Sequence, residues 1–217
     1  KSYGNMARID NAYNAGEIGT FGVTNEVGGI VGRVSNTIVQ SAANVGEVRG
    51  KNDVGGVAGS FSGVAERLEN IYNTGLVEGQ DAVGGILGHL RRNGEILNGY
   101  HANDVHATSA RGGLVGKAEL PTGTSALLKN VLWNNLSGLH DAVGSQVGDG
   151  VVLAGADVHG VALGVLQWAG LYADWKDGEG KALVSTQGGK GTPWRMYDEQ
   201  TMPLLTGLMQ GVKTVGK

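Results

Sequence analysis

A five-residue glycine box recurs along the chain at nearly constant spacing, and this repeat constrains the fold more than any other feature. The sequence Gly28-Gly29-Ile30-Val31-Gly32 returns at positions 55–59, 84–88 and 112–116, with steps of 27, 29 and 28 residues. A degenerate fifth copy occupies positions 144–148 after a step of 32. Self-similarity with a period of about 20 to 50 residues is typical of proteins that stack one supersecondary unit on the next. We therefore expect a stacked architecture.

A second box lies between the glycine boxes. Residues 9–18 align with residues 39–48, 68–77, 96–105 and 128–137. From the start of this box to the last glycine of the next box, four copies span 21 residues each, and only the first copy is longer, at 24. The joints between units vary instead, with 6, 8, 7 and 11 residues. Strands that pair with their equivalents one repeat away cannot change length independently, so the variation indicates loops along one edge of a stack.

Each repeat unit reads as strands and turns. Glycine occurs at three or more places in a unit, which leaves no stretch long enough for a helix of 3.6-residue periodicity. Alternation predicts that Leu68, Asn70 and Tyr72 share one face of a strand, and the equivalent residues of the other copies do the same. The sequence therefore predicts an all-β fold, a right-handed parallel β-helix (β-solenoid) of about five coils over residues 1–148.

Two columns of equivalent positions have a distinct composition. Positions 16, 46, 75, 103 and 135 are Gly, Gly, Gly, Asn and Asn, the residues that most readily accept positive φ, so we expect left-handed corners there. Positions 11, 41, 70, 98 and 130 are Asn, Ser, Asn, Asn and Asn. Stacking would place these side chains in a row, and we expect amide ladders between coils.

The repeat fades after Gly148, and three of the four tryptophans, at positions 168, 175 and 194, lie beyond it. The end of a solenoid exposes unpaired backbone and an apolar cross-section, so a distinct cap is needed for solubility. We assign residues 149–217 to a C-terminal cap or a transition to further coils, with a short helix or turn expected at 201–209.

Composition excludes several classes of function. The 17 basic and 20 acidic side chains give a net charge of −3 without a long run of one sign, which argues against a nucleic-acid partner. There is no cysteine, no apolar run of membrane-spanning length and no zinc-type histidine spacing. We expect no cofactor, no metal, no membrane span and no catalytic residues. Because the chain begins with Lys1 and shows no export signal, we treat it as part of a longer chain.

The variable joints contain the one group of residues that we single out for binding. They hold five cations against Glu66, Glu95 and Glu119, a local excess of +2 on an acidic chain. If the joints stack on one side, these cations could contact an anionic or hydroxyl-rich polysaccharide through charge-assisted hydrogen bonds. The alternative is a solvated edge that prevents aggregation. The candidate ligand-binding residues are Arg33, Arg67, Arg91, Arg92 and Lys117.

Two motifs carry a family resemblance. The boxes at 70–77 and 83–88 resemble the GLUG motif of large bacterial surface and secreted proteins, and residues 192–205 look like the segment that closes such arrays in filamentous-haemagglutinin-like exoproteins. At 101–103, His-Ala-Asn replaces the Asn-Thr-Gly of the motif. The resemblance implies two-partner secretion through an outer-membrane transporter, a location outside the cell or on its surface, and a role as an adhesin or biofilm-matrix protein.

The sequence thus predicts a non-catalytic structural or adhesive segment of a large bacterial secreted or surface adhesin, with an extracellular polysaccharide or cell-surface glycan as partner. Two alternatives come from other classes. One is a polysaccharide-degrading β-helix enzyme, which would need clustered acidic and basic side chains on one strand face over consecutive coils. The other is the stalk of a secreted peptidase whose catalytic domain lies elsewhere in the full chain.

Overall fold

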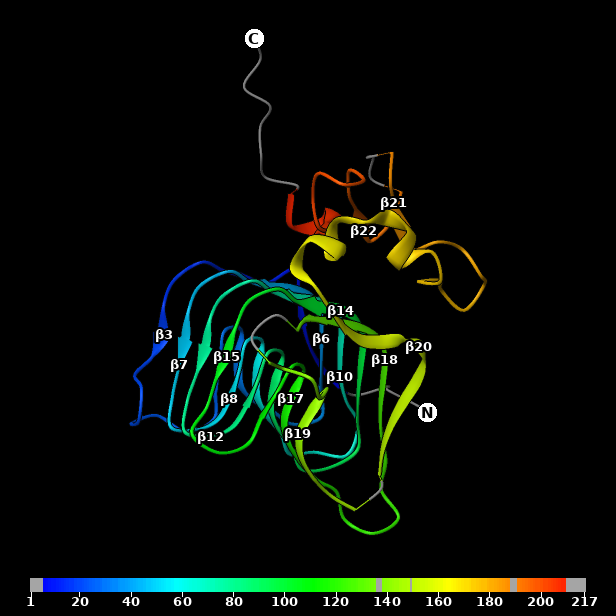
Figure 1. Cartoon of the computed structure of the whole chain (residues 1–217). Coiled ribbons are helices and arrows are strands. Elements are labelled where there is room, and N and C mark those ends of the chain that lie inside the picture. Colours follow the sequence, from blue (N-terminus) through cyan, green and yellow to red (C-terminus); the bar gives the residue numbers. More distant parts are fainter. Residues whose placement is uncertain (1–5, 136–137, 149, 188–190, 210–217) are drawn as a thin grey trace.

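Short parallel strands in equivalent positions of successive repeats make up most of the chain. The computed structural model describes residues 6–135, 138–148, 150–187 and 191–209, and no α-helix occurs among them. Four parallel sheets run along a solenoid of about five coils, as predicted (Figure 1). A membrane-spanning helix, one both long and apolar enough for the task, is not found in these described ranges.

Sheet A is the widest, and its strands come from the second box of each repeat. Its members are β1 (Ala7–Asp10), β2 (Tyr13–Asn14), β6 (Thr37–Asn44), β10 (Glu66–Asn73), β14 (Gly94–His101), β18 (Ala126–Asn134) and β20 (Val151–Val161). The register repeats coil by coil, so that Leu68 pairs with Val39 on one side and with Ile96 on the other. Matched residues of successive repeats therefore lie directly over one another.

The other three sheets complete each coil. Sheet B holds β3 (Ile18–Gly19), β7 (Val48–Arg49), β11 (Val77–Glu78) and β15 (Val105–His106). Sheet C holds β4 (Val27–Gly28), β8 (Asn52–Gly55), β12 (Asp81–Gly84) and β16 (Arg111–Gly112). Sheet D holds β5 (Val31–Val34), β9 (Ala58–Phe61), β13 (Leu87–Leu90), β17 (Val115–Glu119) and β19 (Val143–Val147). All four are parallel because every strand pairs with its equivalent one coil away.

Columns of aliphatic side chains fill the interior. Val48, Val77 and Val105 of sheet B are fully buried, and each stacks on its equivalent in the next coil. Leu68 and Ile71 of β10 both belong to this core, whereas Tyr72 packs on the outside of the sheet. The expectation that Leu68, Asn70 and Tyr72 share one face is therefore wrong.

The reason is a left-handed residue at the equivalent position of each repeat in sheet A. Asn11, Ser41, Asn70, Asn98 and Asn130 have φ angles between 53° and 56°. This conformation bends the strand and interrupts its alternation, so residues three apart can both face the core. Asn is the side chain that best tolerates it after Gly. The row expected to form amide ladders is thus primarily a row of bends, with one ladder bond from Asn130 Nδ2 to Asn98 Oδ1 at 2.8 Å.

The left-handed corners expected at positions 16, 46 and 75 are absent, because these glycines do not have positive φ. They are small for another reason. A Cβ on Gly75 would lie closer than 3.0 Å to the carbonyl oxygen of Gly46, and a Cβ on Gly46 would meet Gly16 in the same way. Close stacking of successive turns, and not backbone handedness, therefore requires glycine at this corner.

A continuous amide ladder lies two residues before that corner. Asn14 Nδ2 donates to Asn44 Oδ1 at 2.7 Å, and Asn44 Nδ2 donates to Asn73 Oδ1 at 2.8 Å. The next member is His101, whose Nδ1 lies 3.0 Å from Asn73 Nδ2. Burial lowers the pKa of His101 to about 4, so its ring is neutral and can accept this hydrogen bond at neutral pH. The ladder stabilises the stack from inside.

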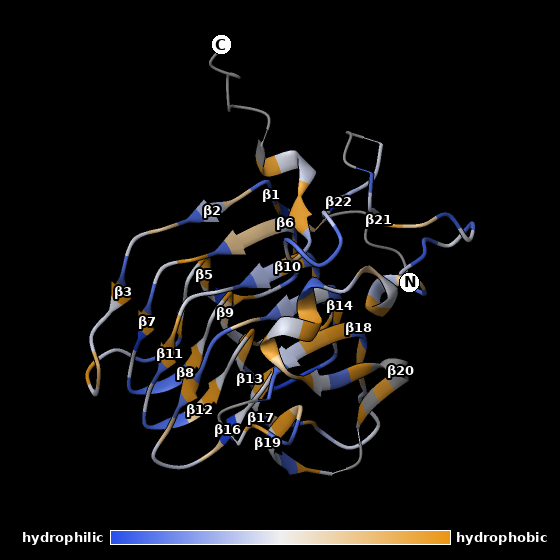
Figure 2. Cartoon of the chain, turned by 45° about the horizontal axis from the view of Figure 1, so that its top comes forward, coloured by the Kyte–Doolittle hydropathy of each residue, from blue (hydrophilic) through white to orange (hydrophobic). Residues whose placement is uncertain are grey.

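The C-terminal region packs sideways on the solenoid. We call residues 163–187 and 191–209 the lateral cap; it contains three 3-10 helices and a small sheet: η1 (Leu163–Gln167), η2 (Ala169–Tyr172), β21 (Val184–Ser185), β22 (Trp194–Arg195), β23 (Leu204–Leu205) and η3 (Thr206–Met209). Figures 1 and 2 both show β21 and β22 beside sheet A and remote from sheet B. The cap expected over the open end of the stack therefore covers the outer face of sheet A, after β20 has extended that sheet by one strand.

An aromatic cluster joins the lateral cap to sheet A. The ring centroid of Trp194 lies 6.1 Å from that of Tyr72, 6.0 Å from that of Tyr100 and 5.9 Å from that of Trp175. Trp194 Nε1 also donates to Asn70 Oδ1 at 3.0 Å, and Tyr100 Oη donates to the carbonyl of Pro203 at 2.8 Å. Burial in this interface raises the pKa of Tyr100 well above its ordinary value.

Candidate functional site: a charged stripe and a tryptophan hollow

Polar residues of sheet D form one column across four coils. Arg33 pairs in register with Ser60, Ser60 with His89, and His89 with Lys117. Carboxylates from sheet C and from the strand ends reach this column. We call the whole set the charged stripe; it consists of Glu26, Arg33, Asp53, Ser60, His89, Arg91, Lys117 and Glu119.

Two acidic residues with a left-handed backbone conformation give the charged stripe its geometry. Glu26 has a φ of 54° and directly precedes β4, and Asp53 has a φ of 57° and lies within β8, both strands of sheet C. The last glycine of each glycine box makes this arrangement possible. A Cβ on Gly59 would clash with the backbone of Glu26, and a Cβ on Gly88 would clash with that of Asp53. The glycine box thus allows sheets C and D to approach closely enough for their side chains to pair.

The first carboxylate bridges two coils. Glu26 accepts from Arg33 Nε at 2.9 Å and from the Ser60 hydroxyl at 3.0 Å, although Arg33 and Ser60 lie on neighbouring strands. The hydrogen bond that Arg33 donates to Glu26 raises the pKa of Arg33 above its ordinary value. The Glu26 carboxylate therefore connects Arg33 on β5 with Ser60 on β9 of the next coil.

The second carboxylate anchors the centre of the stripe. Asp53 Oδ1 lies 2.9 Å from His89 Nδ1, and Asp53 also pairs with Arg91. On the other side of the imidazole, Glu119 Oε2 lies 3.3 Å from His89 Nε2. Lys117 Nζ in turn lies 2.7 Å from Glu119 Oε1. His89 is buried between two carboxylates, which are themselves neutralised by a guanidinium and an ammonium group.

The pKa directions agree with these pairings. Burial acts to raise the pKa of Asp53, but the hydrogen bond from His89 and the charges of His89 and Arg91 outweigh it, so the pKa lies below its ordinary value. The hydrogen bond between Lys117 and Glu119 raises the pKa of Lys117 and lowers that of Glu119. Asp53, Lys117 and Glu119 are therefore charged at neutral pH.

The five cations expected to bind a ligand do not form one patch. Arg33, Arg91 and Lys117 lie in the charged stripe, each paired with a carboxylate. Arg67 belongs to sheet A, where it pairs with Glu95 at 2.7 Å and with Glu69 at 3.2 Å. Arg92 is exposed. Its charge acts to lower the pKa of the buried Glu66, but burial dominates and raises that pKa. The role of these five residues in ligand binding stays a prediction.

The arrangement also bears on metals. Over the described ranges, no three His, Cys, Asp or Glu side chains converge as a metal site would require. In the stripe, Asp53 and Glu119 contact opposite nitrogens of His89, so the three groups surround an imidazole and not a shared cavity. What the stripe does is fix neighbouring coils to one another through charge-assisted hydrogen bonds.

The Asp53 pairing predicts a specific pH dependence. Because the folded-state pKa of Asp53 lies below its ordinary value of 3.8, its ionisation stabilises the fold at neutral pH, and this contribution is lost as the pH falls through the folded-state value. We expect Asp53→Asn to lower the free energy of unfolding by about 2 kcal/mol at pH 7 and by much less at a pH below that folded-state value. Urea unfolding at both pH values measures this difference. Asp174→Asn, at a highly exposed carboxylate, is the control and should change neither value. A deficit of equal size at both pH values would contradict the ion-pair assignment.

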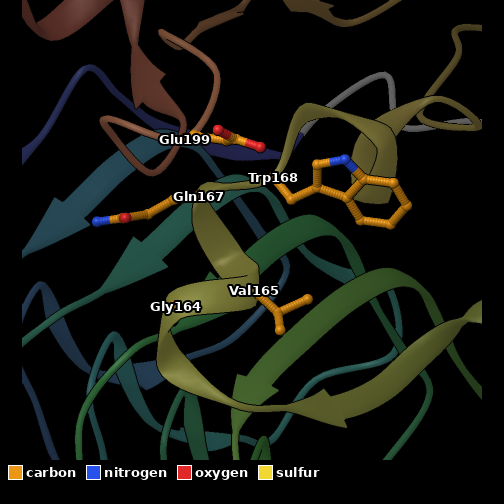
Figure 3. Close-up of a pocket in the computed structure, with 5 residues that line it drawn as sticks. All are labelled: Gly164, Val165, Gln167, Trp168 and Glu199. Atoms are coloured by element: carbon orange, nitrogen blue, oxygen red, sulfur yellow. The ribbon is translucent and has the colours of Figure 1, made fainter.

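A second feature lies on the lateral cap. A hollow of about 290 Å³ is lined by Gly164, Val165, Gln167, Trp168 and Glu199. In Figure 3 the side chains of Val165 and Trp168 project to the same side of the chain, Glu199 comes from a different loop, and the amide of Gln167 extends the opposite way. Trp168 is 53% exposed, which is unusual for the largest apolar side chain.

Two hydrogen bonds fix the hollow. The backbone N–H of Glu199 donates to the carbonyl of Gln167 at 2.8 Å, and the backbone N–H of Ala169 donates to Asp198 Oδ1 at 2.7 Å. These bonds attach the 197–201 turn to the chain on both sides of Trp168. Glu199 itself is left-handed, with a φ of 58°. The sequence places Trp168 in the cap with the other tryptophans but does not predict its exposure. The small residues Ala169 and Gly170 next to it are the one available signal that this indole is less covered.

Comparisons with known proteins place the fold but no family. Neither protein-family models nor curated proteins match the sequence. One solved structure that is similar is the 1.30 Å crystal structure of a putative immunoglobulin A1 protease from Bacteroides ovatus, with 22% sequence identity and a TM-score of 0.50 over 71% of this chain. The chain spans about half of that protein, 49% of its length. At this identity the likeness shows a shared solenoid fold.

Proposed function

We propose that this chain is a non-catalytic structural and adhesive segment of a larger bacterial protein that is secreted or displayed on the cell surface. Its partner is an extracellular polysaccharide or a cell-surface glycan, and the parent chain is exported through an outer-membrane transporter. The GLUG-like boxes and the closing segment at 192–205 support this role by resemblance. The absence of cysteine suits export as an unfolded chain.

The observation that carries the proposal is the uninterrupted register of the stack. Sheet A keeps one pairing from β6 through β10, β14 and β18, and the charged stripe links successive coils on another face. Such a body is a rigid rod whose outer faces have fixed shapes, which suits a spacer or a binding surface. Most of the cations in the variable joints are paired with carboxylates, so the surface has little net positive charge to attract a polyanion. Its polar groups are better suited to hydrogen bonds with sugar hydroxyls.

The adhesive role is tested by applying the purified chain to an array of neutral and acidic polysaccharides. We expect retention on at least one neutral polysaccharide, and only a small loss for the double variant Arg91→Ala/Arg92→Ala, since Arg91 is engaged by Asp53. Arg8→Ala, at an exposed pair with Asp10 on the first coil, is the matched control. Absence of retention on every polysaccharide would reject the adhesive role.

The structural neighbour favours a second candidate. The protein from Bacteroides ovatus is described as a protease, it is about twice as long as the region that this chain matches, and it shares the solenoid. This chain would then be the stalk of a secreted peptidase. Casein cleavage by the full-length parent protein, with none by this segment, would support the stalk role, whereas a parent chain without peptidase activity would reject it.

A further inference from the structure

We infer that the hollow between Trp168 and Glu199 is a carbohydrate-binding site for a neutral, hydroxyl-rich pyranose unit, an inference that rests on the proposed glycan-binding role and gives it a location. Three independent features of the hollow support this assignment. They are an indole exposed to solvent, a carboxylate that extends from a strained backbone into the same hollow, and the charge of the lining residues.

The indole of Trp168 is oriented before any ligand arrives. A Cβ on Gly170 would lie closer than 3.0 Å to atoms of the Trp168 ring, so the bare backbone of Gly170 lies against the ring. The hydrogen bonds of Gln167 and Ala169 to the 197–201 turn fix the main chain on either side. A flat aromatic face that is already held in place stacks on the apolar C–H face of a pyranose at little cost in conformational entropy.

Glu199 supplies the polar half of the site. A non-glycine residue with a φ of 58° is strained by about 1 kcal/mol or more, and such strain is retained where the surroundings over-determine it. Here the Glu199 N–H is bonded to Gln167, while its carboxylate lines the hollow beside Trp168 (Figure 3). A carboxylate oxygen accepts hydrogen bonds from sugar hydroxyls and makes them charge-assisted. The bond to Gln167 fixes the backbone from which this acceptor extends.

The charge of the lining selects the ligand class. Glu199 is the charged residue among the five that line the hollow, and Asp198 adjoins it. A uronic acid would place a second carboxylate in this acidic environment, so acidic polysaccharides are disfavoured. The volume of about 290 Å³ is at the lower end for a ligand pocket and suits a single sugar ring of a longer chain. Leu163 and Tyr197, 40% and 49% exposed, extend the apolar surface of the lateral cap beyond the hollow.

Tryptophan fluorescence reports on this site directly. The other three tryptophans, Trp133, Trp175 and Trp194, are 3%, 0% and 0% exposed, so acrylamide quenching of the native protein is dominated by Trp168. The chain is titrated with hexasaccharides of β-glucan, α-glucan, mannan and galactan, and with an oligogalacturonate as the acidic probe. We expect at least one neutral hexasaccharide to protect the fluorescence from quenching, and the oligogalacturonate to give no protection.

Variants separate this site from other glycan-binding surfaces. Because the Trp168 variants lose the fluorescent reporter, calorimetric titration measures binding by the variants. Trp168→Ala should weaken binding of the protecting hexasaccharide by at least about tenfold, Glu199→Gln by about threefold to tenfold, and Trp168→Phe by less than Trp168→Ala. Tyr13→Ala, at an aromatic residue 57% exposed on the first coil, is the matched control and should bind as the native chain does. Because Trp168 is exposed, its variants should melt at the native temperature, which a thermal scan verifies.

The outcomes are distinguishable. Binding on the polysaccharide array that survives Trp168→Ala would overturn the site while leaving the proposed function intact. Protection by the oligogalacturonate, or by none of the hexasaccharides, would also overturn it. Absence of any polysaccharide binding by the native chain would reject both the site and the adhesive role.

Discussion

Replacement of Gly88 by alanine is expected to destabilise the solenoid by about 3 kcal/mol or more. The added Cβ would lie closer than 3.0 Å to the backbone of Asp53 and Val54 and to the carbonyl oxygen of Gly59. These neighbours are main-chain atoms of paired strands, so they cannot move aside as a flexible side chain would. Relief requires sheets C and D to separate, which also breaks the contact between Asp53 and His89. For a chain of this size the melting temperature should fall by on the order of 10 °C.

Gly178→Ala is the matched control for this substitution. A Cβ on Gly178 would have no heavy atom within 4 Å, and its φ is not in the left-handed region, so the same chemical change should leave stability within about 1 kcal/mol of the native value. Guanidinium unfolding followed by far-ultraviolet circular dichroism measures both variants. Equal stability of the two variants would contradict the close approach of sheets C and D.

Replacement of Trp194 by alanine should have the second large effect, about 3 to 5 kcal/mol, but confined to the lateral cap. Trp194 is fully buried, contacts three aromatic rings and bonds Asn70. Its cluster is separate from the aliphatic core of the solenoid, which keeps its own packing when the indole is lost. The substitution should therefore detach or loosen the lateral cap without unfolding the coils.

Hydrogen exchange detected by mass spectrometry locates this effect. Peptides from residues 163–187 and 191–209 of Trp194→Ala should exchange much faster than in the native chain, whereas peptides from β10 and β14 should keep their protection. Trp168→Ala, at an exposed tryptophan of the same cap, is the control and should leave exchange unchanged. Uniformly faster exchange along the whole chain would show that cap and solenoid are one cooperative unit.

The repeat predicted the coil architecture because its signal is periodic and each coil contributes it again. It misplaced the left-handed residues for a physical reason. Both Gly and Asn suit positive φ, but Gly75 is small because Gly46 of the preceding coil approaches it, whereas Asn70 bends its strand. The residue types at one column of equivalent positions cannot distinguish a close approach between coils from a left-handed backbone conformation. The same bend places Leu68 and Ile71 on one face, which strict alternation could not reveal.

The candidate sites depend still more on three-dimensional proximity. Arg33 and Arg91 lie in the variable joints, but their partners Glu26 and Asp53 come from the other side of a glycine turn. That pairing follows from the left-handed backbone of two acidic residues, for which the sequence has no marker. Trp168 and Glu199 are 31 positions apart in the sequence and meet only through the turn at 197–201. Neither residue lies in the repeat, so periodicity carries no information about them.

The proposed function requires that the chain bind a neutral polysaccharide without cleaving it. The most direct measurement incubates the purified chain with the polysaccharide that retains it on the array, and follows both the bound fraction of protein and the release of reducing ends. We predict saturable retention with no reducing ends above the buffer control over a day. Release of reducing ends that rises with protein concentration would show a degrading enzyme, and a bound fraction indistinguishable from that on uncoated resin would show that the chain is not an adhesin.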